Sequence, residues 1–179
     1  QQAPTVSLRS SERSVAVLVR LLRSGRVLGG LVMVADGRRR PVGPREVAFV
    51  EDLAHEYRMP LGNLLDGAGG SVTSAPRRGH TVFPGVHGFE RSVELLGKVP
   101  VVCAVLGTAA GGPAGRAILS HWSVMVDGIS QVFAAGPPVV ERSLGQKLTK
   151  EELGGPQVAV ALAGTIDNRV DTEENCFAQ

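Results

Sequence analysis

The sequence predicts an α/β fold, in which strands and helices alternate along the chain. Apolar runs rich in Val and Leu alternate with segments whose apolar residues recur at spacings of three and four. The run Pro100–Leu106 is almost wholly apolar, as expected for a strand that is covered on both faces of its sheet. Strands that alternate with helices in this way are typical of a sheet with crossover connections.

The first segment, residues 1–13, is polar and is expected to be a flexible leader. At 179 residues the chain fits one domain of ordinary size, and we assign residues 14–179 to it. Val15–Leu22 and Val27–Ala35 are rich in Val and Leu, which predicts two strands separated by a short turn.

A helix, a strand and a second helix are predicted next. Arg45–Arg58 carries apolar residues at helical spacing, and Pro60 ends this helix. Leu61–Leu65 is a short apolar run that predicts a strand. Residues 71–88 are irregular and contain several Gly and Pro, so we expect a long loop there. A helix is predicted over Phe89–Leu96.

The second half of the chain is predicted to contain short elements. A Pro near the start of a segment favours a helix, because the missing N–H does no harm in the first turn. Thr149, with Glu152 three residues later, has the spacing of a capping box. The predicted helices are Pro113–Ser120, Pro137–Leu144, Thr149–Leu153 and Asp171–Ala178, and the predicted strands are Trp122–Val126, Ile129–Ala134 and Gln157–Leu162.

Two glycine-rich turns follow apolar runs and are the candidate binding elements. The first contains Gly69-Gly70 and the second ends in Gly111-Gly112. Because glycine lacks a Cβ atom, a ligand can approach its backbone closely and bare N–H groups can point at it. Two such groups would stabilise a developing oxyanion, aided by the dipole of the helix predicted after the second turn. This chemistry suits an enzyme that acts on a thioester, although a glycine pair taken alone is weak evidence and favours a plain tight turn.

Several polar residues have structural interpretations. Asp66 is expected to cap the turn that follows it. His121 is expected to cap the C-terminus of the helix before it. Glu151 and Glu152 are expected to cap a helix rather than to act as acid or base.

Composition argues against several classes of partner. The formal net charge of +2 is too small to argue for nucleic acid, and no apolar run reaches the roughly 18 residues of a membrane span. Cys103 and Cys176 form neither a metal-type pair nor a disulfide framework, so we expect no metal. Cys103 lies in an apolar run, where a reduced, packed thiol is expected. A reducing compartment is therefore favoured, namely the cytoplasm, or the mitochondrial matrix in a eukaryote.

The stretch from about Val47 to Phe177 resembles the carboxyltransferase (β) subunit of biotin-dependent acyl-CoA carboxylases, such as propionyl- and methylcrotonyl-CoA carboxylases. Six blocks carry the resemblance by their order and spacing: Pro60–Ser71, Val99–Gly115, Ser123–Val126, Ala135–Val140, Glu151–Gly155 and Asp167–Glu174. The resemblance implies a crotonase (enoyl-CoA hydratase-like) spiral of ββα units. It implies transfer of a carboxyl group from carboxybiotin to the α-carbon of an acyl-CoA.

The resemblance also implies site residues. The thioester enolate would be held by the backbone amides of Gly111 and Gly112, which are the catalytic candidates. The candidates for binding CoA are Gly69, Gly70, Ser71 and Ala110. The first turn matches the family pattern only loosely, so Gly69-Gly70 is equally compatible with a structural turn. Acyl-CoA would be the substrate, with biotin carried by a partner protein.

The family subunit has two crotonase-like domains, and this chain has the length of the N-terminal one only. The implied partners are a biotin carboxylase or biotin carrier subunit, and a chain or domain that supplies the C-terminal carboxyltransferase half, in a homo- or hetero-oligomer. The chain is expected to be incomplete and inactive alone. Arg20–Pro41 departs from the family pattern. The alternatives are a truncated or degenerate, non-catalytic crotonase-fold module that binds CoA or a partner, and a different acyl-CoA reaction such as hydration or decarboxylation.

Overall fold

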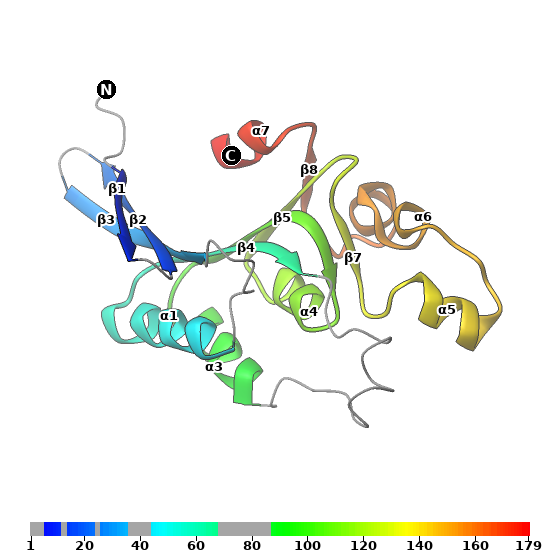
Figure 1. Ribbon diagram of the computed structural model, residues 1–179, viewed down its shortest axis with the longest axis horizontal. Coiled ribbons are helices and arrows are strands. Elements are labelled where there is room, and N and C mark those ends of the chain that lie inside the picture. Colours follow the sequence, from blue (N-terminus) through cyan, green and yellow to red (C-terminus); the bar gives the residue numbers. More distant parts are fainter. Residues whose placement is uncertain (1–5, 12–13, 24–25, 36–43, 68–86) are drawn as a thin grey trace. The chain divides into compact units, whose positions relative to one another are not determined.

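The computed structural model describes residues 6–11, 14–23, 26–35, 44–67 and 87–179 (Figure 1). The chain divides into two compact units. Unit 1 comprises Gln1–Leu61 and Val86–Pro100, and unit 2 comprises Gly62–Gly85 and Val101–Gln179. The expected single domain over residues 14–179 stays a prediction.

Unit 1 contains a three-stranded antiparallel sheet in the order β1-β2-β3. Strands β2 (Ser14–Arg23) and β3 (Arg26–Ala35) confirm the two strands predicted in this region. Strand β1 (Val6–Ser11) was not predicted, because it lies in the stretch expected to be a leader. It pairs with β2 from Val6 opposite Val19 to Ser11 opposite Ser14. A run of six residues with only two strongly apolar members carries too weak a pattern to reveal a strand that a neighbouring strand stabilises.

Two helices of unit 1, α1 (Pro44–Tyr57) and α3 (His87–Leu96), confirm the helices predicted there and pack on each other. Their contact contains a buried polar pair, in which the Ser92 hydroxyl donates to Glu51 Oε1 over 2.7 Å. A buried carboxylate is tolerated when hydrogen bonds satisfy its oxygens.

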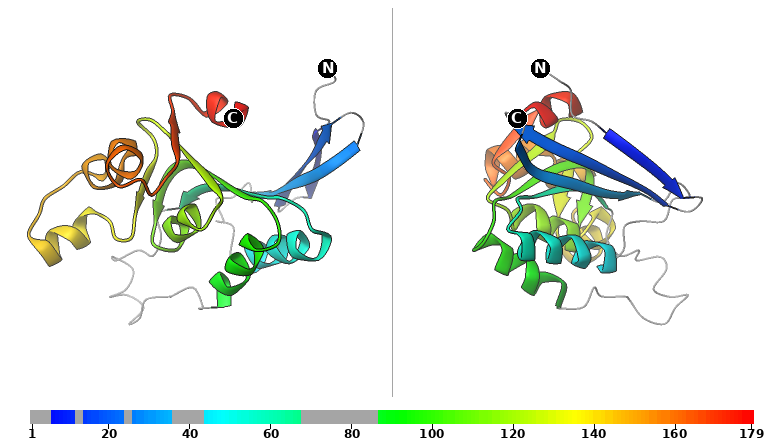
Figure 2. Two further views of the ribbon diagram at one scale, coloured as in Figure 1. Left: turned by 180° about the vertical axis from the view of Figure 1, so that it is seen from behind. Right: turned by 90° about the vertical axis from the view of Figure 1, so that its left-hand side faces the viewer.

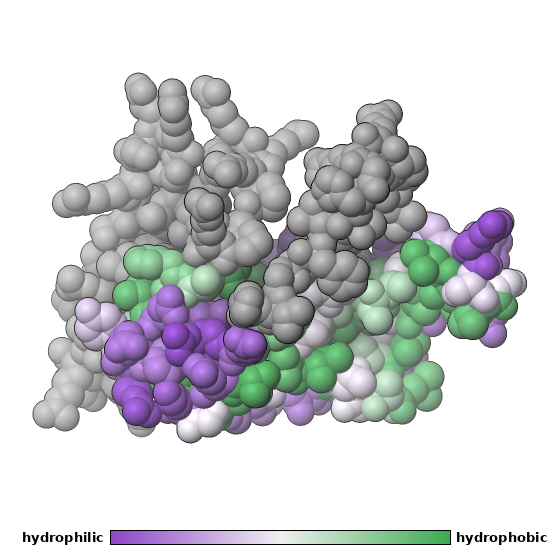
Figure 3. Space-filling model, turned by 90° about the horizontal axis from the view of Figure 1, so that it is seen from below, coloured by the Kyte–Doolittle hydropathy of each residue, from purple (hydrophilic) through white to green (hydrophobic). Residues whose placement is uncertain are grey.

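Charged side chains connect the same two helices at the surface. Arg91 donates to Asp52 over 3.0 Å and to Glu94 over 2.7 Å. In Figure 3 one group of hydrophilic side chains lies over α1 and α3. Exposed ion pairs of this kind contribute little to stability, so we assign them no function.

Unit 2 is built on a five-stranded sheet with the path β4-β5-β6-β8, and with β7 paired to β5. Its strands are β4 (Leu61–Gly67), β5 (Val101–Ala110), β6 (Trp122–Val126), β7 (Gln131–Phe133) and β8 (Asn168–Val170). The pairings of β5 with β6, of β5 with β7 and of β6 with β8 are parallel. The α/β prediction is confirmed, as are the strands predicted over Leu61–Leu65, Pro100–Leu106, Trp122–Val126 and Ile129–Ala134. Strand β8 was not predicted.

The helices of unit 2 agree closely with prediction. They are α4 (Gly112–Ile118), α5 (Pro137–Leu144), α6 (Lys150–Gly154) and α7 (Glu173–Ala178). The predicted capping box at the start of α6 is confirmed, because Thr149 and Glu152 exchange both hydrogen bonds. The bonds from Thr149 lower the pKa of the Glu152 carboxyl.

The strand predicted over Gln157–Leu162 is wrong. This segment is a wide helical turn, η1 (Gln157–Leu162), in which Ala163 N donates to Val158 O over 2.8 Å. Pro156 precedes it with helical backbone angles, so α6 leads into η1 rather than into an extended chain. The alternation of Val, Ala and Leu matched a strand, but helical winding is what places Ala159 in the core.

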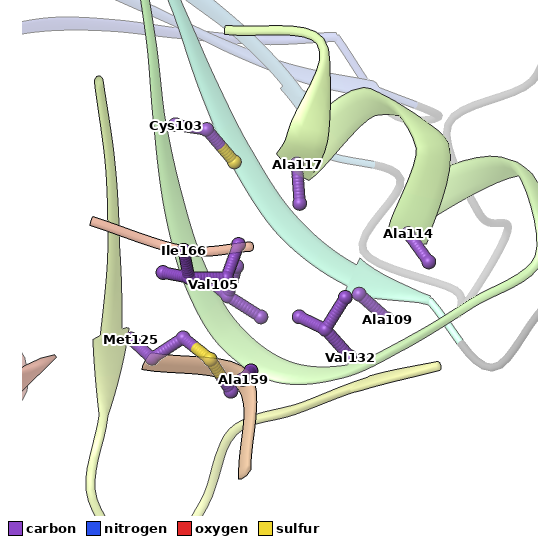
Figure 4. Close-up of a cluster of buried hydrophobic side chains, with 9 residues drawn as sticks. All are labelled: Cys103, Val105, Ala109, Ala114, Ala117, Met125, Val132, Ala159 and Ile166. Atoms are coloured by element: carbon purple, nitrogen blue, oxygen red, sulfur yellow. The ribbon is translucent and has the colours of Figure 1, made fainter. Parts of the chain in front are cut away.

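The sheet of unit 2 has a core on each face. Figure 4 shows the larger one, where side chains of β5, α4, β6, β7 and η1 converge. Its members are Cys103, Val105, Ala109, Ala114, Ala117, Met125, Val132, Ala159 and Ile166. On the other face Val124, Val126 and Cys176 of α7 form a smaller cluster. Strand β5 alternates between the two faces, which explains why its sequence is apolar throughout.

The Cys103 thiol is free and buried, as predicted. Burial raises the pKa of Cys103 from 9.0 to about 12, and an electrostatic contribution from Cys176 adds to the rise. The folded state therefore favours the neutral thiol. The contribution of the buried thiol to stability is complete below the pKa of the unfolded state. It is lost as the pH rises through the pKa of the folded state.

We expect the free energy of unfolding to fall between about pH 8 and pH 10, and less so in Cys103→Val, which keeps an apolar side chain without the thiol. Urea titrations at both pH values measure this difference. The same loss in both proteins would contradict the assignment to Cys103.

Within the described ranges, no helix is both long enough and apolar enough to span a membrane.

Candidate functional site

The second glycine turn connects β5 to α4, and its two glycines have different surroundings. Gly111 has φ of +65°, a conformation that favours glycine. Its N–H donates to the Phe133 carbonyl of β7 over 3.1 Å, and its carbonyl accepts from Gly115 N over 3.0 Å. Both polar groups of Gly111 are thus used within the fold, so this residue shapes the turn.

Gly112 is the first residue of α4. An N–H in the first turn of a helix has no carbonyl partner in its own helix. The next residue, Pro113, has no N–H to compete for a ligand. Gly112 therefore offers the amide of the pair that suits an incoming oxygen atom, at the end of β5 and at the positive end of the helix dipole.

Beside this turn, four polar side chains form a continuous chain of hydrogen bonds. Thr108 Oγ1 donates to Gln131 Oε1 over 2.8 Å, and Gln131 Nε2 donates to Glu151 Oε2 over 3.4 Å. Lys150 Nζ donates to Thr108 Oγ1 over 3.4 Å. These bonds connect β5, β7 and α6. Sequence reasoning missed Thr108 and Gln131, although a polar residue within each of two apolar runs is the signal that could have found them.

The described part of the first glycine turn lies on β4. The Asp66 carboxyl packs so closely over Gly107 of β5 that a Cβ at Gly107 would lie 3.1 Å from the Asp66 Cβ and overlap its carboxyl group. The CoA-binding candidates Gly69, Gly70 and Ser71 lie outside the described residues, as does the turn that Asp66 was expected to cap. Ala110 is the last residue of β5 and is buried opposite Phe133.

The expected capping role of His121 is wrong. The C-cap of α4 is Leu119. His121 instead pairs with the first residue of β5: its N–H donates to Val101 O over 2.8 Å, and its Nδ1 accepts from Val101 N over 3.0 Å. The imidazole thus fixes the start of β6 beside β5, and Nδ1 carries no proton in this arrangement.

Among the residues that the structure describes, no group of three or more His, Cys, Asp or Glu side chains could hold a metal ion.

Comparison with known proteins identifies the family. The model of the carboxyl transferase domain matches residues 25–179. This chain belongs to the carboxyl transferase domain family. The match confirms the resemblance on which the expected site was based, and it includes most of Arg20–Pro41, the segment that departs from the family pattern.

Curated relatives within the carboxyl transferase family share about a third of the aligned residues. The chain is 32% identical over 136 residues to the uncharacterized carboxylase YngE of Bacillus subtilis, covering 74% of this chain and 26% of that protein. It is 31% identical over 146 residues to the biotin-dependent acetyl-/propionyl-coenzyme A carboxylase beta5 subunit of Mycobacterium tuberculosis, covering 80% of this chain and 26% of that subunit. The chain thus spans about a quarter of these relatives.

Solved structures confirm the crotonase-type fold expected for a carboxyl transferase domain. The β subunit of geranyl-CoA carboxylase from P. aeruginosa matches with a TM-score of 0.66 and 23% identity, over 89% of this chain and 30% of that chain. A chain of the Pseudomonas malonate decarboxylase MdcD-MdcE hetero-dimer matches with a TM-score of 0.61 and 19% identity, over 93% of this chain and 73% of that one.

Proposed function

We propose that this chain binds an acyl-CoA and holds its thioester during carboxyl transfer to the α-carbon. The family match supports the reaction class. The observation that carries the proposal is the Gly112 amide, which lies in the first turn of α4 directly after a buried parallel strand. Ligands of open α/β sheets bind outside the carboxyl ends of the strands, and this turn lies at such an end.

The chain contributes electrostatic stabilisation to this reaction. When the α-proton leaves, negative charge develops on the thioester oxygen, and a fixed N–H aimed at that oxygen stabilises the charge without reorganisation. Gly112 supplies that donor, and Gly111 sets its direction because its positive φ turns the chain into α4. Biotin on a carrier protein would supply the carboxyl group.

The remaining machinery belongs to partners in this proposal. The relatives with an assigned carboxylase activity are about four times as long as the matched segment, and the M. tuberculosis relative is named a subunit. We propose that a biotin carboxylase or biotin carrier, and a chain or domain with the C-terminal carboxyltransferase half, complete the reaction. The cytoplasmic location stays a prediction.

Decarboxylation of a carboxylated acyl-CoA is the second candidate. The methylmalonyl-CoA decarboxylase alpha subunit of Veillonella parvula is 26% identical to this chain over 136 residues. Loss of the carboxyl group passes through the same thioester enolate, so the same amide would serve.

The variant Gly112→Val is expected to weaken propionyl-CoA binding by about tenfold or more, because the new side chain blocks the approach to the amide and the hydrogen bond is lost. Titration calorimetry measures the affinity, and circular dichroism checks the fold. The control is Gly62→Val in β4, where a valine suits a strand and where a Cβ would meet Val102 at an ordinary 4.0 Å. Unchanged affinity in a folded Gly112→Val protein would exclude the proposed site.

A further inference from the structure

We propose that Gln131 is a positioning residue for the thioester site, acting through β7 on the Gly111-Gly112 turn. The inference rests on the proposed function and adds a residue that has no direct contact with the substrate. Gln131 lies on β7, a strand of only three residues.

Each residue of β7 makes a different connection. Phe133 accepts the Gly111 N–H on its carbonyl. Val132 packs into the larger core, and its carbonyl lies against Gly154 of α6. Gln131 makes its connections through its side chain, to Thr108 of β5 and to Glu151 of α6. A parallel pair of three residues has few backbone bonds, so side-chain bonds have a large share in fixing its position.

The position of Gln131 makes these bonds hard to replace. Gln131 is only 9% exposed. Leaving a buried amide, or the hydroxyl that faces it, without a partner costs more than the bond itself contributes. Gln131 also lies directly opposite Thr108 in the register of β5 and β7. The side-chain bond therefore fixes the same register that places Phe133 opposite Ala110.

This register decides where the Gly111 N–H is held. If β7 shifts, the Phe133 carbonyl moves away from Gly111, and the turn that presents the Gly112 amide changes direction. A donor contributes to oxyanion stabilisation only when it is aimed at the oxygen within a narrow range of distance and angle. We therefore expect Gln131 to affect recognition of the thioester carbonyl specifically, not the affinity for CoA as a whole.

Two ligands separate these effects. Propionyl-CoA has the thioester carbonyl, and S-propyl-CoA has the same number of carbons without that oxygen. The ratio of their affinities, measured by calorimetry on the full chain, reports on the carbonyl alone. The unmodified chain should prefer propionyl-CoA. Equal binding of both ligands, or no binding, would argue against the proposed function itself, before any variant is considered.

The variant Gln131→Leu should lower that preference by about three- to tenfold, the range expected for one hydrogen bond, and leave S-propyl-CoA binding unchanged. Thr108→Val removes the same bond from the other side and should act in the same direction, which keeps the test valid if the first variant does not fold. Asn168→Leu on β8 is the matched control, since Asn168 bonds Gln179 and not β5 or β7.

A rescue completes the test. Gln131→Glu would place a carboxylate beside Glu151 and should lower the preference. Adding Glu151→Gln again gives the two side chains one amide donor and one carboxylate acceptor. The double variant should therefore regain the preference for propionyl-CoA over S-propyl-CoA. A positioning role is refuted if folded Gln131→Leu and Thr108→Val keep the full preference for the thioester. It is equally refuted if they weaken both ligands by the same factor, which is what a general structural role predicts.

Discussion

Gly154→Ala should destabilise unit 2 by about 1–3 kcal/mol, the usual cost of forcing extra volume into a packed site. At Gly154, helix α6 lies directly against the backbone of β7. A Cβ at Gly154 would overlap the Val132 carbonyl oxygen and lie 2.9 Å from its carbon atom. Because the obstacle is backbone within a paired strand, it cannot move aside as the end of a flexible side chain could. The helix or the strand must shift instead.

The direction of this effect makes it a sharp test. In an ordinary helix, exchanging glycine for alanine stabilises by about 1 kcal/mol. Urea unfolding followed by circular dichroism gives the change, with Gly62→Ala as the control because a Cβ there meets only an ordinary contact at 4.0 Å. An increase in stability for Gly154→Ala would show that α6 does not lie this close to β7.

Met125→Ala should cost about 2–5 kcal/mol, as expected when a fully buried side chain is truncated. Met125 lies on β6 and is fully buried in the larger core, where it meets β5 and η1. The loss combines the transfer of the missing atoms to water with the cavity that neighbours held by a sheet cannot fill.

The control for Met125→Ala is Leu162→Ala in η1, since Leu162 is 75% exposed. That change should stay within about 0.5 kcal/mol. Thermal or urea unfolding of both variants measures the contrast. Similar losses for the two variants would show that the core is not centred on the face that Met125 occupies.

Most helices and strands could be predicted because their signals are local. The capping box at Thr149, the Pro residues that open α4 and α5 and the apolar runs of β5 and β6 each act within a few residues. The errors concern segments whose structure depends on distant partners. Strand β1 is held by β2, and η1 by the core that receives Ala159.

The site could be predicted only in part, for a similar reason. The glycine pair could be found in the sequence, and the family resemblance predicted that its amides hold a thioester. The sequence could not show that the Gly111 N–H is bonded within the described part of the fold, unlike that of Gly112. That bond depends on the Phe133 carbonyl, 22 residues further along the chain. The same holds for Gln131, whose bond to Thr108 spans 23 residues. Contacts between neighbouring parallel strands leave no periodic trace in a sequence.

Helix α5 shows how unevenly stability is distributed in unit 2. It lies away from the sheet of its unit (Figure 1, Figure 2), and none of its eight described residues is buried. Pro137 at its start and Gly145, whose N–H donates to Glu141 O over 3.0 Å, support it only locally. A helix this short is marginal in water without packing. Its amide hydrogens can therefore exchange with solvent through local opening, while those of β5 exchange only when the whole unit unfolds.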